Sequence, residues 1–207
     1  MDLNSKYPAI SDLRSKARKR IPHFAWEYLD SATGDESTLH RNRSALDAIH
    51  FVPRGLRGEI KPQLATEFLG KSYSAPFGIA PVGMSGLMWP GAEKTLAGFA
   101  AGAKIPYGMS TVATTRPEDV APYLGDMGWF QMYPPRDEAI RNDMIQRVKN
   151  AGFTTLVVTI DVPAQSRRER QIRGGLVQPP RLTPRILAQV AGCPEWALRT
   201  ALNGKPR

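Results

Sequence analysis

Residues 155–169 read TLVVTIDVPAQSRRE, and this stretch indicates the class of fold. Residues 156–158 of this stretch, LVV, form a short apolar run that is not interrupted by polar residues. Such a run is typical of a strand that is covered on both faces, as in a parallel sheet. The run is followed by polar and basic side chains, namely Thr159, Arg167, Arg168 and Arg170. In parallel α/β folds ligands bind at the carboxyl ends of the strands, so the stretch predicts one wall of a binding site.

Upstream of this stretch, strand-like and helix-like segments alternate. The expected strands are 76–84, 105–111, 128–133 and 155–161, and the expected helices between them are 91–104, 116–125 and 137–152. This order predicts a parallel sheet, either an open doubly wound one or a barrel. Each strand ends in small or hydrogen-bonding residues, and no G-x-G-x-x-G follows the first strand, which favours the barrel. We therefore expect an α/β fold of the (β/α)8 TIM-barrel type, with only the first four β/α units present.

The segments on either side of this region have a different character. Helices are expected at 9–20, 22–32 and 35–49, and the turn-rich residues 58–75 leave room for one short hairpin. The C-terminal segment is rich in Arg and Pro and contains two short apolar helical pieces. We therefore expect three parts: an N-terminal helical cap and connection at 1–74, the first half of a (β/α) barrel at 75–163, and a basic loop or lid at 164–207.

Composition limits the class of protein. No apolar run approaches the ~20 residues that span a bilayer, and the polar N-terminus lacks the apolar core of a signal peptide. The single cysteine, Cys193, excludes an intramolecular disulfide and fits a reducing compartment. We therefore expect a cytoplasmic protein.

The positive charge is concentrated near the C-terminus. Of the net charge of +9, residues 161–207 supply +6, from nine basic and three acidic side chains. A solvated loop, an anion-binding site, an anionic membrane surface or nucleic acid could each account for it. Nucleic acid is disfavoured, because the segment has no nucleic-acid motif and a single aromatic residue, Trp196. Its apolar helical pieces with basic flanks are compatible with peripheral contact of residues 164–207 with the inner face of the membrane.

Six segments follow one another in register between about residue 8 and residue 180. They are AWEYLDSA, NRSALDAIHFVPRGL, PFGIAPVGM, MSTVATTRPEDV, WFQMY and TIDVPAQSRRER. Each alone is a weak signal, but together they resemble the N-terminal half of the FMN-dependent 2-hydroxy acid dehydrogenase/oxidase family. This family includes glycolate oxidase, L-lactate dehydrogenase and mandelate dehydrogenase. The resemblance implies FMN as cofactor, oxidation of a small L-2-hydroxy acid to the 2-oxo acid, and a homo-oligomer in the full-length form.

The resemblance also implies a cofactor site, residue by residue. The backbone expected to run along the flavin ring is that of Ala80, Pro81, Val82 and Gly83, where a small residue at the last position allows close approach. Ser110, Gln131 and Thr159 are expected to hydrogen-bond the polar edge of the isoalloxazine, whose donors and acceptors match amide and hydroxyl groups. Without the resemblance, Gln131 and Thr159 would be interpreted as ordinary polar strand ends.

The substrate contacts implied by the resemblance are Tyr28, Tyr133 and Arg168. Both tyrosines are expected to face the substrate, and Arg168 is expected to hold its carboxylate, because guanidinium–carboxylate pairing is bidentate and charge-assisted. From the residues alone, Tyr28 would be a packing aromatic and Arg168 a solvated charge. Arg167 and Arg170 are close neighbours in sequence, so the choice among the three arginines stays open.

Several parts of the family's active site cannot be assigned in this chain. In the family, a histidine in the second half of the barrel removes the substrate proton, and an arginine, a lysine and a phosphate-binding segment also lie there. His23, His40 and His50 all precede the first expected strand and are interpreted as structural or solvated. We expect no metal site and no catalytic residue here, so the isolated chain should neither turn over substrate nor bind FMN tightly. The alternative is a truncated, non-catalytic half-barrel that binds a partner or ligand.

Overall fold

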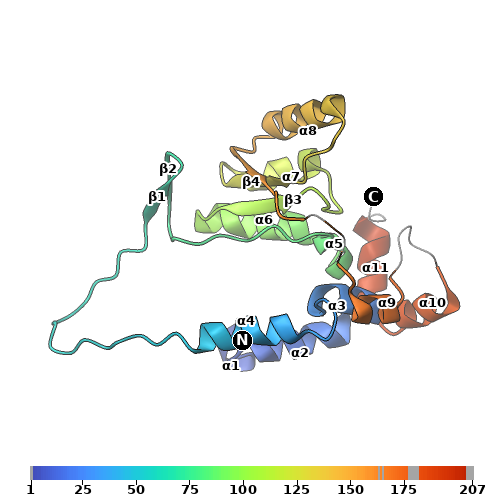
Figure 1. The fold of residues 1–207 in the computed structure, drawn as a ribbon, viewed down its shortest axis with the longest axis horizontal. Coiled ribbons are helices and arrows are strands. Elements are labelled where there is room, and N and C mark those ends of the chain that lie inside the picture. Colours follow the sequence, from blue (N-terminus) through green and yellow to red (C-terminus); the bar gives the residue numbers. More distant parts are fainter. Residues whose placement is uncertain (1, 163, 165, 177–181, 204–207) are drawn as a thin grey trace. The chain divides into compact units, whose positions relative to one another are not determined.

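The structure is a computed structural model that describes residues 2–162, 164, 166–176 and 182–203 (Figure 1). The chain divides into two compact units. Unit 1 comprises Met1–Pro62 and Ala164–Arg199, and unit 2 comprises Gln63–Pro163 and Thr200–Arg207. Parts of the expected basic segment, residues 177–181 and 204–207, lie outside the described residues.

Both units contain most of the elements that the sequence pattern predicts, together with short helices that it does not; the expected strand at 76–84 is the exception. The helices of unit 1 are α1 (Leu3–Lys6), α2 (Ile10–Arg20), α3 (His23–Asp30), α4 (Ser37–Asp47), α9 (Glu169–Gly174) and α10 (Pro184–Ala191). Unit 2 has the hairpin β1 (Thr66–Phe68) and β2 (Lys71–Tyr73), the strands β3 (Tyr107–Ser110), β4 (Gly128–Met132) and β5 (Thr155–Val158), and the helices α5 (Ser85–Met88), α6 (Ala92–Ala103), α7 (Pro117–Leu124) and α8 (Glu138–Asn150). The boundary between the two units falls within α11 (Pro194–Asn203).

The ends of α7 and α8 follow from local sequence. At the start of α8, the Asp137 carboxylate accepts hydrogen bonds from the backbone N–H groups of Ala139 and Ile140, which have no partner inside the helix. Basic residues lie in its last turn, where the helix dipole favours them. Helix α7 begins with Pro117, whose fixed φ suits a first helical turn and which has no N–H to leave unpaired.

The sheet of unit 2 is parallel, with strand order β3-β4-β5. Ser110 lies opposite Gln131 on the neighbouring strand, and Gln131 lies opposite Val157. Parallel strands that alternate with helices confirm the α/β class. The expected first strand, residues 76–84, is different: it forms one parallel bridge, between Ile79 and Tyr107. Prolines at 76 and 81 have no N–H to donate, which explains why no longer ladder forms.

The strand β5 is less covered than the sequence suggests. Its apolar run predicts burial on both faces, but Leu156 is 40% exposed and Val158 is 45% exposed. The physical reason is its position, because β5 is the last strand in the order of the described sheet. Side chains on an edge strand have a neighbouring strand on one side only. The expectation of a fully covered strand is therefore wrong for this chain.

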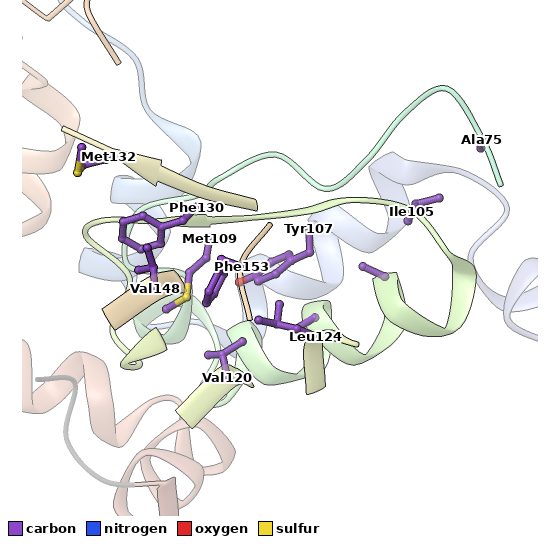
Figure 2. Close-up of a cluster of buried hydrophobic side chains, with 12 residues drawn as sticks. Ala75, Ile105, Tyr107, Met109, Val120, Leu124, Phe130, Met132, Val148 and Phe153 are labelled. Carbon is purple, nitrogen blue, oxygen red and sulfur yellow. The ribbon is translucent and has the colours of Figure 1, made fainter. Parts of the chain in front are cut away.

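One face of the sheet packs against helices to form the core of unit 2. Figure 2 shows Tyr107, Met109 and Phe130 of the strands beside the helix residues Val120, Leu124 and Val148 and the loop residue Phe153. The rings of Phe130 and Phe153 meet edge to face, with centroids 5.8 Å apart. Alanines at 97 and 100 in α6 are fully buried. Because this face is occupied by the core, the opposite face of the sheet is the one that can bind a ligand.

Unit 1 has a smaller core around α3. Phe24, Ala25 and Trp26 of this helix are buried. The ring of Trp196 meets that of Phe24 edge to face, with centroids 6.0 Å apart. Ile186 of α10 is also buried. Residues far apart in sequence therefore hold α3 in place.

Candidate functional site

Polar side chains from three neighbouring strands gather on the face of the sheet opposite the core. Side chains alternate between the two faces of a strand, and Tyr107, Met109 and Phe130 point into the core. The opposite face therefore carries Gly108, Ser110, Trp129, Gln131 and Val157. Thr159 follows two residues after Val157, just beyond the end of β5.

Ser110, Gln131 and Thr159 form one hydrogen-bonded chain. The Ser110 hydroxyl donates to Gln131 Oε1 at 3.2 Å, and Gln131 Nε2 donates to Thr159 Oγ1 at 2.7 Å. Ser110 and Gln131 are each 5% exposed. Three residues expected at the cofactor edge are thus brought together at the carboxyl ends of their strands.

The hydrogen bonds among these three side chains leave polar hydrogens that can bind a ligand. A glutamine amide carries two hydrogens, and Gln131 uses one of them on Thr159. The Thr159 hydroxyl accepts in that bond, and the part of the chain that the structure describes offers no acceptor for its own hydrogen. The three linked side chains therefore offer an amide N–H and a hydroxyl O–H, which can bind a group that has acceptors along one edge.

Thr111 is a site residue that the sequence does not single out. Its hydroxyl donates to the backbone carbonyl of Gln131, and its backbone N–H donates to Gln131 Oε1 at 3.3 Å. Its hydroxyl oxygen also accepts from the backbone N–H of Tyr133 at 3.2 Å. Thr111 therefore fixes both the Gln131 side chain and the start of the segment after β4. Its place directly after Ser110 is the one sequence signal that could have identified it.

Tyr133, expected to face the substrate, lies directly after β4 in unit 2. Its side chain is exposed, at 43%, while its backbone is held by Thr111. An exposed phenol at a fixed backbone position is available to a ligand, and no described contact assigns it a packing role in the core.

The segment that carries Ala80, Pro81, Val82 and Gly83 runs beside β3. It is held by backbone bonds on either side, from Gly108 N–H to the Ile79 carbonyl and from Met84 N–H to the Val112 carbonyl, each 2.8 Å. A side chain at Gly108 would not fit, because a Cβ there would lie 2.9 Å from Pro81 Cδ. The first three of the four residues are exposed and Gly83 is half-buried. The segment therefore lies at the surface of unit 2.

An apolar cavity of about 450 Å³ lies against the same segment. Its lining includes Phe68, Tyr73, Phe77, Pro81 and Trp129. The indole N–H of Trp129 donates to the Tyr73 hydroxyl at 3.0 Å, so the hairpin is tied to the sheet at this end. The cavity is therefore lined by aromatic side chains together with residues 79–81.

The two remaining substrate candidates, Tyr28 and Arg168, lie in unit 1 and contact each other. The guanidinium carbon of Arg168 is 5.8 Å from the centre of the Tyr28 ring, which is a cation–π distance. Among the described residues, Arg168 has no ion pair with a carboxylate, so its charge is not neutralised by a neighbouring acid.

Arg170 has a different role from Arg168. Its guanidinium pairs with three carboxylates: Glu27 at 2.7 Å, Asp30 at 3.0 Å and Glu36 at 3.1 Å. All three are largely buried, with side chains 7%, 12% and 16% exposed. A guanidinium occupied in this way is not available to a substrate, so Arg170 fastens α9 to α3. Arg167 contributes its backbone carbonyl, which accepts from the N–H of Gly34.

We expect Arg170→Ala to destabilise the protein by about 2 kcal/mol. Breaking a fully buried pair costs about 3–5 kcal/mol, and the partial exposure of Arg170 reduces this figure. Arg173→Ala is the matched control, because that arginine is 72% exposed and pairs only with Glu169 among the described residues. Urea denaturation followed by circular dichroism measures both. Equal midpoints for the two variants would contradict the assignment.

The same cluster predicts a loss of stability in acid. Burial raises the pKa of Asp30, but hydrogen bonds from Arg170 and Arg14 outweigh it and hold the pKa below its ordinary value. A depressed carboxyl pKa contributes stability above about pH 4, and this stability is lost as pH falls through the folded pKa. Denaturation midpoints should therefore fall in acid, and by a smaller amount in Arg170→Ala. An identical decline in both proteins would exclude the cluster as the cause.

The three histidines lie outside the sheet and its loops. His23 is half-exposed on α3, with Nδ1 3.6 Å from Glu27 Oε1, and His40 and His50 are exposed. Unit 2 contains no histidine. In the described residues, no group of three or more His, Cys, Asp or Glu is placed to hold a metal ion. None of the helices in that part of the chain is long and apolar enough to cross a membrane.

Comparisons with known proteins identify the family of this chain. Residues 17–206 match the family described as FMN-dependent dehydrogenase. An L-lactate dehydrogenase of Vibrio parahaemolyticus is 36% identical over 198 residues, which are 96% of this chain and 52% of that protein. An L-lactate dehydrogenase of Xanthomonas campestris is 37% identical, covering 96% of this chain and 51% of the relative. The chain thus spans about half the length of the curated relatives it matches.

Solved structures give the same result. The monotopic membrane protein (S)-mandelate dehydrogenase matches with a TM-score of 0.88 and 32% identity, over 96% of this chain and 53% of the other. A mandelate oxidase matches with a TM-score of 0.77 and 31% identity, over 86% of this chain and 52% of the other. Family, relatives and fold therefore agree, and the chain belongs to the FMN-dependent dehydrogenase family.

Proposed function

We propose that unit 2 supplies part of an FMN site, in a protein that oxidises a small L-2-hydroxy acid to the 2-oxo acid. The observation that carries the proposal is the hydrogen-bonded chain Ser110–Gln131–Thr159 at the carboxyl ends of three strands. The names of the relatives, L-lactate dehydrogenase and mandelate dehydrogenase, support the substrate class.

The chemistry of the site fits FMN. The polar edge of an isoalloxazine presents both donors and acceptors, and the amide and hydroxyl groups of Gln131, Ser110 and Thr159 can match both. The flat ring needs an apolar surface, and the exposed segment Ala80–Gly83, which packs closely on β3 at Gly108, is the proposed one. When bound, FMN supplies a two-electron acceptor. The protein residues bind it and orient it.

For the substrate we propose Arg168, Tyr28 and Tyr133. Of the three neighbouring arginines, Arg168 is the one proposed to bind the substrate carboxylate, because the guanidinium of Arg170 already pairs with three carboxylates of the protein. A guanidinium binds a substrate carboxylate in two parallel hydrogen bonds and so orients it. The Tyr28 ring beside Arg168 restricts the arginine side chain, which reduces the entropy lost on binding.

We further propose that the three parallel strands and the bridge at Ile79 belong to the first half of a (β/α)8 barrel. The parallel order, the helices on one face and the polar residues at the carboxyl ends of the strands support this proposal. The exposed edge at β5 is where a further strand would pair.

Titration of the purified chain with FMN tests the proposed cofactor site. Binding should quench flavin fluorescence and shift the visible absorbance bands in a saturable way, with weak affinity. A linear response up to millimolar FMN, with no saturation, would sink the proposal.

A second function, contact with an anionic membrane surface, is favoured by exposed leucines in the basic C-terminal segment. Leu187 on α10 is 54% exposed and Leu198 on α11 is 61% exposed. Residues 161–207 carry an excess of six positive charges. Burial of leucine side chains among lipid chains, together with attraction of basic residues to anionic headgroups, would hold the segment at the surface.

We expect the double variant Leu187→Glu with Leu198→Glu to bind anionic vesicles at least about tenfold more weakly, since each buried leucine is worth about 1.5–3 kcal/mol. The matched control changes two exposed leucines of α4, Leu39 and Leu46, to glutamate. Co-sedimentation with phosphatidylglycerol–phosphatidylcholine vesicles measures both. If the two double variants sediment alike, the segment is not the contact.

A further inference from the structure

Glu93 is a fully buried carboxylate in the first turn of α6. Burial alone raises the pKa of Glu93, but backbone hydrogen bonds, including those from Thr114 and Gly86, outweigh it and hold the pKa below its ordinary value. The carboxylate is therefore an anion inside unit 2, and the groups that bind it are uncharged. Such an arrangement is costly unless every lone pair is well used.

Four donors converge on this carboxylate. Glu93 Oε1 accepts from Gly86 N–H at 2.9 Å, from Thr114 N–H at 3.0 Å and from the Thr114 hydroxyl at 2.9 Å. Glu93 Oε2 accepts from the Thr115 hydroxyl at 3.1 Å. The bonds come from two segments, the short helix α5 and the loop after β3, so one side chain links them.

Helix α5 and the loop after β3 are both continuous with the proposed cofactor segments. Gly86 comes three residues after Gly83, and Thr114 comes four residues after Ser110. The backbone bond from Met84 N–H to the Val112 carbonyl lies between these points. Glu93 therefore adds a second link, beyond this backbone bond, between the residues that follow segment 80–83 and those that follow β3.

The fit around the carboxylate is close. A Cβ added at Gly86 would overlap Thr114 Oγ1 and would lie 2.8 Å from Glu93 Oε2. A glycine is thus required for α5 to approach Glu93. A movement of α5 or of the loop after β3 would break bonds to a buried anion, so the two segments are held rigidly.

We propose that Glu93 is a positioning residue for FMN: its carboxylate fixes the backbone of residues 80–83 relative to Ser110, Gln131 and Thr159. This inference rests on the proposed cofactor site. Glu93 itself acts through α5 and the loop after β3, without touching the cofactor.

Measuring FMN affinity in Glu93 variants tests the inference. Glu93→Ala removes the acceptor of all four bonds, and we expect at least about tenfold weaker FMN binding. Glu93→Gln keeps an oxygen for the donors at Oε1, so we expect rescue to within about threefold of the wild-type affinity. Thr114→Val removes one hydroxyl donor and should weaken FMN binding by about threefold. This variant tests the inference in place of Glu93→Ala if Glu93→Ala does not fold.

A control separates positioning from general stability. Leu124→Ala opens a cavity in the core of unit 2. Leu124 lies on the buried face of α7, outside α5 and the loop after β3. It should lower the urea midpoint while the FMN dissociation constant and the visible circular dichroism of the bound flavin stay unchanged in the folded protein. Hydrogen exchange at the Gly86 and Thr114 amides should speed up in Glu93→Ala and stay slow in Leu124→Ala.

The outcomes distinguish this inference from the proposed function. If wild type binds FMN and Glu93→Ala binds it equally well, the positioning role is wrong and the cofactor site stands. If Leu124→Ala weakens binding as much as Glu93→Ala, the effect is one of stability and the positioning role is also wrong. If wild type shows no saturable binding, the cofactor site fails and this inference fails with it.

Discussion

The isolated 207-residue chain, mixed with saturating FMN and L-lactate or L-mandelate without oxygen, is expected not to reduce the flavin. Removal of the substrate proton needs a base, and a well-placed general base contributes about 100- to 10,000-fold to the rate. No histidine occurs after His50, and unit 2 has none. His23, His40 and His50 all lie in unit 1, and none belongs to the sheet.

Loss of the visible flavin absorbance under anaerobic conditions measures this reaction. Dithionite provides the control, since it should bleach the flavin fully and show that the flavin can accept electrons. Bleaching by L-lactate or L-mandelate faster than in free FMN would mean that this chain contains a base that the structure does not reveal. Such a result would replace the prediction of inactivity with that of a complete catalytic site.

Gln131→Leu is expected to weaken FMN binding by about tenfold to a hundredfold. The substitution leaves the Ser110 hydroxyl and the Thr111 N–H without their acceptor and removes the donor to Thr159. Those losses are shared by the free and the bound protein, but leucine also leaves the FMN group that Gln131 is proposed to bind without a partner in the complex. One such unpaired group costs about 1–3 kcal/mol, and about 1.4 kcal/mol corresponds to a factor of ten in affinity. Leucine is close to glutamine in size, so steric disruption should be small.

The control for this substitution is Gln146→Leu. Gln146 is exposed on α8, and its side chain bonds to Asn150 one turn along the helix. It should leave FMN affinity unchanged. Fluorescence titrations give both dissociation constants, and urea denaturation confirms that both variants are folded. Should Gln131→Leu bind FMN as wild type does, the chain Ser110–Gln131–Thr159 is not the cofactor edge.

Much of unit 2 is predictable from its sequence, because the signals are local. The expected strands at 105–111 and 128–133 contain β3 and β4, and the expected helix at 137–152 contains α8. The gathering of Ser110, Gln131 and Thr159 follows from the same order, since parallel strands end at one edge. Their roles toward FMN, like those of Tyr28, Tyr133 and Arg168, stay predictions.

Other features depend on contacts that a linear sequence does not reveal. The exposure of Leu156 follows from the position of β5 at the edge of the sheet, and apolar composition alone suggests burial. Glu93 resembles an ordinary acidic residue in a first helical turn, where the helix dipole favours it. Only the folded structure shows that its carboxylate accepts from four donors, three in the loop after β3 and one in α5.

The ties from Arg170 to α3 have a consequence for the order of folding. Glu27 and Arg170 are far apart in sequence, and between them lie the residues from 63 to 163 that form the sheet and its helices. During synthesis from the N-terminus, a contiguous domain folds as a unit once its residues have emerged, whereas α3 must wait for α9. The part of the chain that is made first is therefore completed last, and Phe24 lacks its contact with Trp196 while the ribosome translates the sheet.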